Sequence, residues 1–151
     1  MKTEVKTASE LARSTPPSPL QVAFRELEFF DVGDPARVED VFSPDLIDHN
    51  PANPEKPGIE GMRALIEGLR AGFTNSVHRI LFYRELPDDW VLVHWEMTAT
   101  HTGEFLGVPA TGKPVALKGI DIFHIVGGKV AEIYHVEEML KLAQQLGVQS
   151  A

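Results

Sequence analysis

The sequence predicts an α+β fold, in which helices from the first half of the chain are covered by a curved antiparallel sheet from the second half. Two changes of pattern indicate it. Apolar residues recur at helical spacing across 20–33 and again across 62–72. From residue 76 onward they alternate with a period of two, through four stretches separated by turn residues. A twisted sheet that curls over helices forms a cone, and we expect a binding pocket inside it.

The first part of the chain is expected to hold a tail and three helices. Residues 1–17 are polar and lead into "STPPSP", which predicts a flexible N-terminal tail before a single domain over 18–151. After the helix over 20–33, Asp34 as an N-cap before a proline predicts a short second helix. The segment "DLIDHNP" predicts a short extended piece, and a third helix is expected to end at Gly72.

The second part is expected to be an antiparallel meander closed by a helix. The predicted strands are "SVHRILFYREL", "DDWVLVHWEMTATH", "KPVALKGIDIFHIV" and "KVAEIYHVE". The amphipathic stretch "EEMLKLAQQLG" then predicts a last helix, with Gly147 as its C-cap.

Composition narrows the class of partner. The 151 residues include 14 Lys and Arg against 22 Asp and Glu, for a net charge of -8. No basic cluster stands out, so nucleic acid is not an expected partner. The absence of cysteine excludes disulfides, thiolate zinc sites and a cysteine nucleophile. The apolar runs fall far short of the ~20 residues that span a membrane, and the first residues do not resemble a secretory signal. We therefore expect a cytoplasmic protein.

Asp121 is the residue that most needs an explanation. In "GIDIFHI" it lies between two isoleucines of a predicted strand, although Asp is a poor strand former and a buried charge is costly. The hairpin turn "VGGK" fixes the register of the two strands that it joins. Counting outward from this turn pairs Phe123 with Glu132 and Asp121 with Tyr134. These four residues are then expected on one face, the inside of the cone, with Ile120, Ile122, Ile133, His124 and His135 on the other.

The preceding strand brings two further candidates to the same face. Trp95 and His101 share the apolar side of "DDWVLVHWEMTATH" and are expected to converge with Asp121. A register slip of one residue would exchange the faces. A structural explanation stays open for each residue: a bulge or edge position for Asp121, a solvent-exposed ion pair for Glu132, and a place in the core for Trp95 and Tyr134.

The six histidines do not predict a metal site. Neither HExxH nor a three-ligand cluster is present, and His124 and His135 are expected to face away from Asp121. Phosphate-binding glycine loops and GxSxG are also missing, so neither nucleotide binding nor serine hydrolysis is expected. His49 and His101 remain as candidate polar groups near the pocket, with a hydrogen-bonded loop or strand-end histidine as the alternative for each.

Several motifs together resemble a known family. They are "DHNP", "GIEGMRALIEGLRAGF", "THTGEFLGVPATGK", "GIDIFHIVGGKVAEIYHVEE" and the closing "QLG". In this order they are similar to the SnoaL-like polyketide (ester) cyclases of the NTF2-like superfamily, over residues 20 to 147. The resemblance implies an NTF2-like cone, usually dimeric through the outer face of its sheet. It also implies that Asp121 acts as acid and base in an intramolecular aldol ring closure without metal or cofactor, and it matches His101 to a family histidine. The sequence departs from the family pattern at His124, at "PATG" and at Tyr134.

The resulting hypothesis is a cofactor-free cyclase acting on an aromatic or polyketide ester. Burial raises the pKa of an Asp toward the range that a general base needs. His101 is expected to stabilise the enolate oxygen, while His49, Trp95, Phe123, Glu132 and Tyr134 contact the substrate. Two alternatives stay open: another enzyme of the same cone, such as an isomerase, dehydratase or epoxide hydrolase, and a non-catalytic dimeric binding module.

Overall fold

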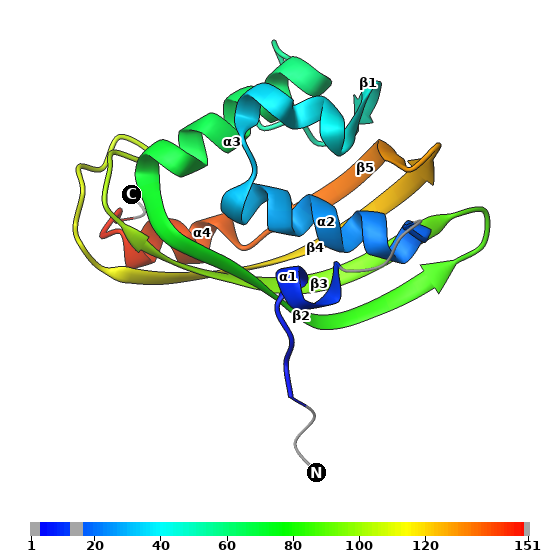
Figure 1. Ribbon diagram of the computed structural model, residues 1–151. Coiled ribbons are helices and arrows are strands. Elements are labelled where there is room, and N and C mark those ends of the chain that lie inside the picture. The colour runs from blue at the N-terminus through cyan, green and yellow to red at the C-terminus, as the bar shows by residue number, and fades with distance from the viewer. Residues whose placement is uncertain (1–3, 13–16, 150–151) are drawn as a thin grey trace.

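The computed structural model describes residues 4–12 and 17–149 as a curved five-stranded sheet with helices on its concave side (Figure 1). The elements are α1 (Ala8–Leu11), α2 (Pro19–Val32), the 3-10 helix η1 (Pro35–Asp40), β1 (Phe42–Asp48), α3 (Ile59–Gly72), β2 (Phe73–Leu86), β3 (Trp90–His101), β4 (Pro114–Val126), β5 (Lys129–Glu137) and α4 (Met139–Gln145). The sheet order is β1-β5-β4-β3-β2. The predicted α+β class and the cone are confirmed, and we call the concave side of the sheet its inner face.

The helices begin and end where local chemistry predicts. Ser18 caps α2, because its side chain accepts a hydrogen bond from the Gln21 amide at 3.3 Å. Asp34 caps the next element in the same way, although that element is a 3-10 helix. The helix α3 ends at Gly72 as predicted. In α2 the apolar stripe buries Phe24 and Leu27 against the sheet, so this helix fills much of the cone.

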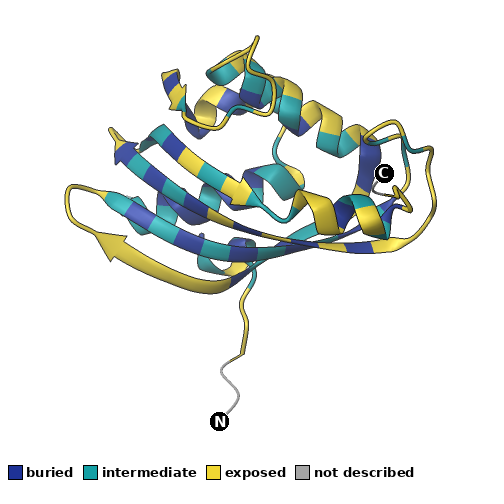
Figure 2. Ribbon diagram, turned by 180° about the vertical axis from the view of Figure 1, so that it is seen from behind, coloured by how far each residue is buried: buried dark blue, intermediate teal, exposed yellow. Residues whose placement is uncertain are grey.

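The meander of β2, β3, β4 and β5 is antiparallel as predicted, and a fifth strand extends it. The segment expected only to be extended is β1, which pairs in parallel with β5. Along β3 and β4 the burial alternates residue by residue, visible as bands in Figure 2. The buried set on β3 includes Trp95 and His101, which confirms the face predicted for that strand.

The register between β4 and β5 differs from the prediction. Gly127 and Gly128 form the expected turn, both with positive φ, and Ile125 pairs with Val130 as expected. The register then shifts, so that His124 pairs with Glu132 and Asp121 with His135. The bulge at Ala131 adds one residue to β5 and turns every later side chain to the opposite face.

The bulge therefore reverses the facing predicted for Glu132, Tyr134, Ile133 and His135. Glu132, Tyr134 and Val136 lie on the outer face of the sheet, not inside the cone. Ile133 and His135 lie on the inner face, where both line the cavity described below. Alternation cannot reveal such a bulge, because the sequence on both sides of it keeps a period of two.

Gly119 explains how Asp121 and Trp95 come to face one another. The strands β3 and β4 pair without irregularity, with Trp95 opposite Gly119 and Val93 opposite Asp121. A Cβ atom at position 119 would lie 2.2 Å from Cζ2 of Trp95. The glycine thus leaves room for the indole to lie across β4 beside the carboxylate.

Part of the expected tail forms a short helix. Thr7 and Glu10 build a capping box at the start of α1, and the carbonyl of Lys6 accepts a hydrogen bond from the Ile80 amide at 2.9 Å. Residues 1–3 and 13–16, also in the expected tail, lie outside the described residues. In the part of the chain that the structure describes, no helix is both long and apolar enough to cross a membrane.

Candidate active site

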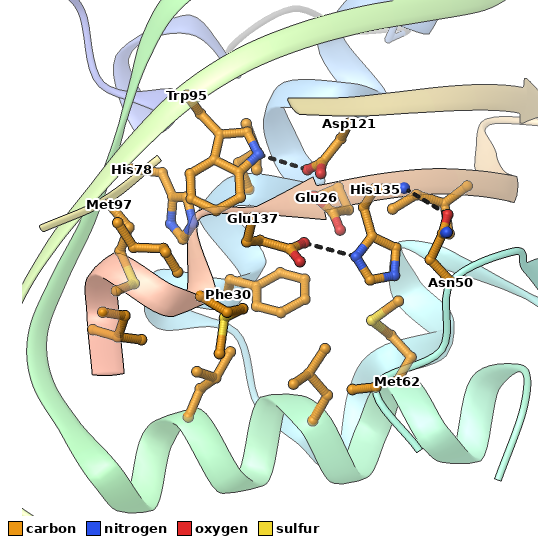
Figure 3. Close-up of a pocket in the computed structure, with 18 of the residues that line it drawn as sticks. Glu26, Phe30, Asn50, Met62, His78, Trp95, Met97, Asp121, His135 and Glu137 are labelled. Atoms are coloured by element: carbon orange, nitrogen blue, oxygen red, sulfur yellow. Dashed lines mark hydrogen bonds and ion pairs between the residues drawn. The ribbon is translucent and has the colours of Figure 1, made fainter. Parts of the chain in front are cut away.

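A cavity of about 460 Å³ lies between the inner face of the sheet and the helices α2, α3 and α4 (Figure 3). Its walls are mainly apolar, with Leu27, Phe30, Met62, Leu69, Leu117 and Ile133 among them. Its polar lining residues are Glu26, Asn50, His78, Asp121, His135 and Glu137. Within the described chain, neither Lys nor Arg lines it. A largely apolar pocket with a few convergent polar groups is typical of a small-molecule site.

Asp121 presents one bound and one free carboxylate oxygen. Its Oδ2 accepts a hydrogen bond from Nε1 of Trp95 at 2.8 Å, while Oδ1 is buried and has no hydrogen-bond partner among the described residues. Burial, together with the charge of Glu137, raises the pKa of Asp121 to about 7, although the Trp95 bond and His135 oppose the rise. Asp121 can therefore take up and release a proton near neutral pH.

Glu26 is a second buried carboxyl group of the cavity. It projects from α2 and is 1% exposed, and its Oε2 has no partner in the described structure. Burial and the neighbouring charge of Asp121 raise the pKa of Glu26 well above its ordinary value, although His135 acts in the opposite direction. Burial therefore favours the protonated form of the Glu26 carboxyl.

His135 supplies the positive charge of the cavity wall. Its Nδ1 lies 2.7 Å from Glu137 and its Nε2 lies 3.0 Å from Asp48, while its backbone amide donates to Oδ1 of Asn50 at 3.2 Å. Burial disfavours the imidazolium, but the hydrogen bonds to the two carboxylates outweigh it and raise the pKa of His135 to about 10. These contacts tie β1 and the loop after it to β5.

His78 is held at another wall by Asp31. The imidazole Nδ1 lies 2.7 Å from Oδ1 of Asp31, and the His78 backbone amide donates to Oδ2 of the same carboxylate at 2.8 Å. The His78 ring meets Trp95 edge to face, with centroids 4.8 Å apart. The ring is thus fixed in orientation where β2 borders the cavity.

The structure brings together only some of the residues predicted from the sequence. Asp121 and Trp95 meet in the cavity. Phe123 is fully buried on the inner face but lies in the core and is not part of the cavity lining. His101 is also fully buried, at the end of β3, where Nδ1 lies 2.9 Å from the hydroxyl of Thr111. His101 does not line the cavity either.

His49, Glu132 and Tyr134 lie outside the cone, so the expectation that they face the pocket is wrong. The ring of His49 stacks on Tyr134 at 3.8 Å, and its Nε2 lies 2.6 Å from Glu132. The other oxygen of Glu132 lies 3.6 Å from His124, which stacks on Trp90. We call these five residues the outer cluster. The bulge at Ala131 places Glu132 and Tyr134 there, and the departure from the family pattern at Tyr134 concerns this face.

Four titratable residues of the cavity were missed by the sequence analysis. Glu26 interrupts an otherwise apolar stripe of buried residues on α2, which is a usable signal for an internal acid. His78 alternates in phase with Ile80, and both are buried. His135 and Glu137 were assigned to the wrong face or not assigned, because the bulge carries no sequence signal. Among the described residues, no group of three or more His, Asp or Glu side chains is arranged to hold a metal ion.

The fold is a cone that encloses a cavity of the size and lining typical of small-molecule sites. Comparisons with known proteins define the family of the chain. The family described as SnoaL-like polyketide cyclase matches residues 16–146. The chain therefore belongs to the SnoaL-like polyketide cyclase family, as the motifs indicated.

Two similar curated proteins come from Streptomyces. The aklanonic acid methyl ester cyclase DnrD of Streptomyces peucetius is 29% identical over 105 residues, which are 70% of each chain. The aklanonic acid methyl ester cyclase DauD of Streptomyces sp. strain C5 is 27% identical over 110 residues, which are 73% of this chain and 66% of DauD. Among solved structures, TsrD of Streptomyces laurentii superposes with a TM-score of 0.76 at 27% identity, over 91% of this chain and all of TsrD.

Proposed function

We propose that this protein catalyses an intramolecular aldol-type ring closure of a neutral polyketide or aromatic ester, with Asp121 as its acid and base and without a cofactor. The observation that carries the proposal is the state of Asp121, which is buried in an apolar cavity with one oxygen free and a pKa of about 7. The similarity to two ester cyclases supports the same class of reaction.

The reaction needs one proton to move twice. The free Oδ1 of Asp121 removes a proton from the carbon beside a ketone, and the resulting enolate carbon attacks a second carbonyl of the same molecule. The alkoxide that forms takes the proton back from Asp121, so the product is an isomer of the substrate. The hydrogen bond from Trp95 holds Oδ2 and leaves Oδ1 directed at the substrate. This chemistry does not involve His101, which lies away from the cavity.

The lining of the cavity favours a neutral substrate. A volume of about 460 Å³ lies in the range of drug-sized ligands. Because none of the described lining residues is a Lys or Arg, a free carboxylate on the ligand would be buried without a positive partner beyond His135, which is already paired. An ester or ketone avoids this cost. The described lining contains no arginine, so it does not support an epoxide hydrolase mechanism of the kind that needs one.

Asp121→Asn tests the proposal, because Asn has nearly the same shape and cannot act as a base. Turnover of a synthetic aromatic polyketide methyl ester, followed by chromatography of the cyclised isomer, should fall by about 10²–10⁴-fold. Glu132→Gln makes the same chemical change on the outer face and should leave turnover unaltered. Equal activity of both variants would refute the acid–base role. Ligand binding without turnover in the unmodified protein would identify a binding module instead.

A further inference from the structure

Two buried oxygens of the cavity are left without a hydrogen-bond partner among the described residues. They are Oδ1 of Asp121, on β4, and Oε2 of Glu26, on α2. Both side chains line the cavity and both are at least 95% buried, and Figure 3 shows Glu26 beside Asp121 and His135. Buried polar atoms are normally satisfied, so these two oxygens are free to bond a ligand or a water molecule that enters the cavity.

The two carboxyl groups differ in the proton that they carry. The negative charge of Asp121 is the second largest cause, after burial, that raises the pKa of Glu26. Two interacting carboxyls in one site do not both ionise readily, and a difference in environment separates an acid from a base. Asp121 keeps the hydrogen bond from Trp95, which favours its charged form, whereas Oε2 of Glu26 has no such partner among the described residues. The proton therefore stays on Glu26 when Asp121 is ionised.

We propose that Glu26 is the proton donor of the cavity: its carboxylic acid binds the ketone oxygen of the ligand while Asp121 removes the proton from the adjacent carbon. This inference rests on the proposed acid–base function of the cavity and adds a second catalytic residue to it. It also defines what the cavity recognises, namely a carbonyl or phenol-type oxygen that accepts a strong hydrogen bond.

The donor completes the proton balance of the first step. The C–H bond beside the ketone breaks, its proton passes to Asp121, and the electron pair forms the C=C bond of an enol. The ketone oxygen takes the proton of Glu26 and leaves a carboxylate there. When the enol carbon attacks the second carbonyl, the enol proton returns to Glu26, and the new alkoxide takes the proton of Asp121. Both residues then regain their starting states.

The surroundings of Glu26 suit this exchange. The charged groups that act on it are Asp121, Glu137 and Asp31, which oppose its ionisation, and the imidazolium of His135, which favours it. His135 can therefore stabilise the transient carboxylate of Glu26, while Glu137 and Asp31 favour the return of its proton, joined by Asp121 once Asp121 has given its own proton to the alkoxide.

Carbon-13 NMR of the labelled side-chain carboxyls tests the proposal without a known substrate. Glu26→Gln assigns the Glu26 resonance, and we expect this carboxyl to be protonated at pH 7 and to shift when 2-naphthol, a phenol-type probe, is added. Glu28→Gln, on the same helix and outside the cavity lining, serves as the matched control for an acid-to-amide change. A Glu26 resonance that is ionised at pH 7, or that 2-naphthol does not move, overturns the proposal.

A binding measurement separates this proposal from the aldol proposal. In an Asp121→Asn background, the ultraviolet spectrum of bound 2-naphthol reports its affinity and its ionised fraction. Glu26→Leu should weaken binding by about tenfold, because the hydrogen bond that the carboxylic acid donates to the naphthol oxygen is lost. Glu26→Gln should weaken it less, because the amide still donates, and Glu28→Gln should have no effect. Unchanged binding by Glu26→Leu refutes the donor. Full turnover by Asp121→Asn with a protonated, probe-responsive Glu26 refutes only the aldol proposal.

Discussion

The two faces of one sheet carry similar side chains in very different states. The inner face has His78 and His135 beside carboxylates, and the outer cluster has His49 and His124 beside Glu132. The inner imidazoles are at most 9% exposed, whereas the outer ones are about 30% exposed. On the inside, burial raises the pKa of Asp121 and Glu26, while the carboxylates of Asp48 and Glu137 raise the pKa of His135 against the effect of burial. Residue type alone therefore does not identify the site, because burial and hydrogen-bond partners determine how readily each side chain gains or loses a proton.

Replacing His135 should have the largest effect on stability. His135→Leu leaves Asp48 and Glu137 without their shared cation, and removing one partner of a buried ion pair costs about 3–4 kcal/mol. Urea unfolding at pH 7 measures the loss. The outer counterpart His124→Leu should cost less than about 1 kcal/mol, because its pairing with Glu132 is partly solvated. Equal losses for the two variants would show that the buried ion pairs of His135 stabilise the fold no more than the partly solvated pair of His124.

The stabilisation that His135 provides should also depend on pH. The folded pKa of His135, about 10, lies above the ordinary 6.5, so the stabilisation is fully present below about pH 6.5 and is lost as the pH rises through 10. The unfolding free energies of the unmodified protein and of His135→Leu should therefore approach each other as the pH is raised toward 10. A constant difference would mean that His135 stabilises the fold by its shape and not by its charge.

The sequence was sufficient for the architecture and for one half of the site. Helical periodicity and alternation identified α2, α3 and the meander, because each of these elements buries one regular face. The anomaly of Asp121 in an apolar strand led to the cavity, and the alternation of β3 placed Trp95 beside it. These inferences needed only local patterns and an uninterrupted register between β3 and β4.

The other half of the site could not be predicted, because it depends on one inserted residue and on contacts distant in sequence. The bulge at Ala131 determines that His135 faces the cavity and Tyr134 faces away. The partners of His135 and His78, which are Asp48 and Asp31, come from elements 87 and 47 residues away. Neither pairing leaves a motif in the sequence.

Asp121→Asn should change stability in a direction set by pH. The folded pKa of Asp121, about 7, lies above the ordinary 3.8, so its favourable contribution is complete below about pH 3.8 and is lost as the pH rises through 7. At pH 8 the variant should be more stable than the unmodified protein by about 2–3 kcal/mol, because no charge is buried. The difference should disappear near pH 4. Thermal or urea unfolding across this range measures it, with Glu132→Gln as the solvated control.

The outer face of the sheet is expected to act in assembly, and changes there should have the smallest effect on turnover. The resemblance implies a homodimer through the outer face, and we propose that two copies bury it, since Ile120 and Val136 are 40% and 62% exposed there. Ile133, first expected on this surface, lies on the inner face instead. The unmodified protein should therefore sediment as a dimer at micromolar concentration.

Tyr134→Ala distinguishes an interface residue from a residue of the site. Tyr134 is 43% exposed and stacks on His49 on the side of the sheet opposite the cavity, so turnover per subunit should stay within about twofold of the unmodified protein. Dimer dissociation should become easier by about tenfold, as expected when a central aromatic is truncated at an interface. Sedimentation and a turnover assay on the same sample measure both. A large loss of turnover in a dimer that remains intact would return Tyr134 to the substrate-binding role that the uninterrupted hairpin register predicted for it, and would mean that ligands reach the protein from its outer face.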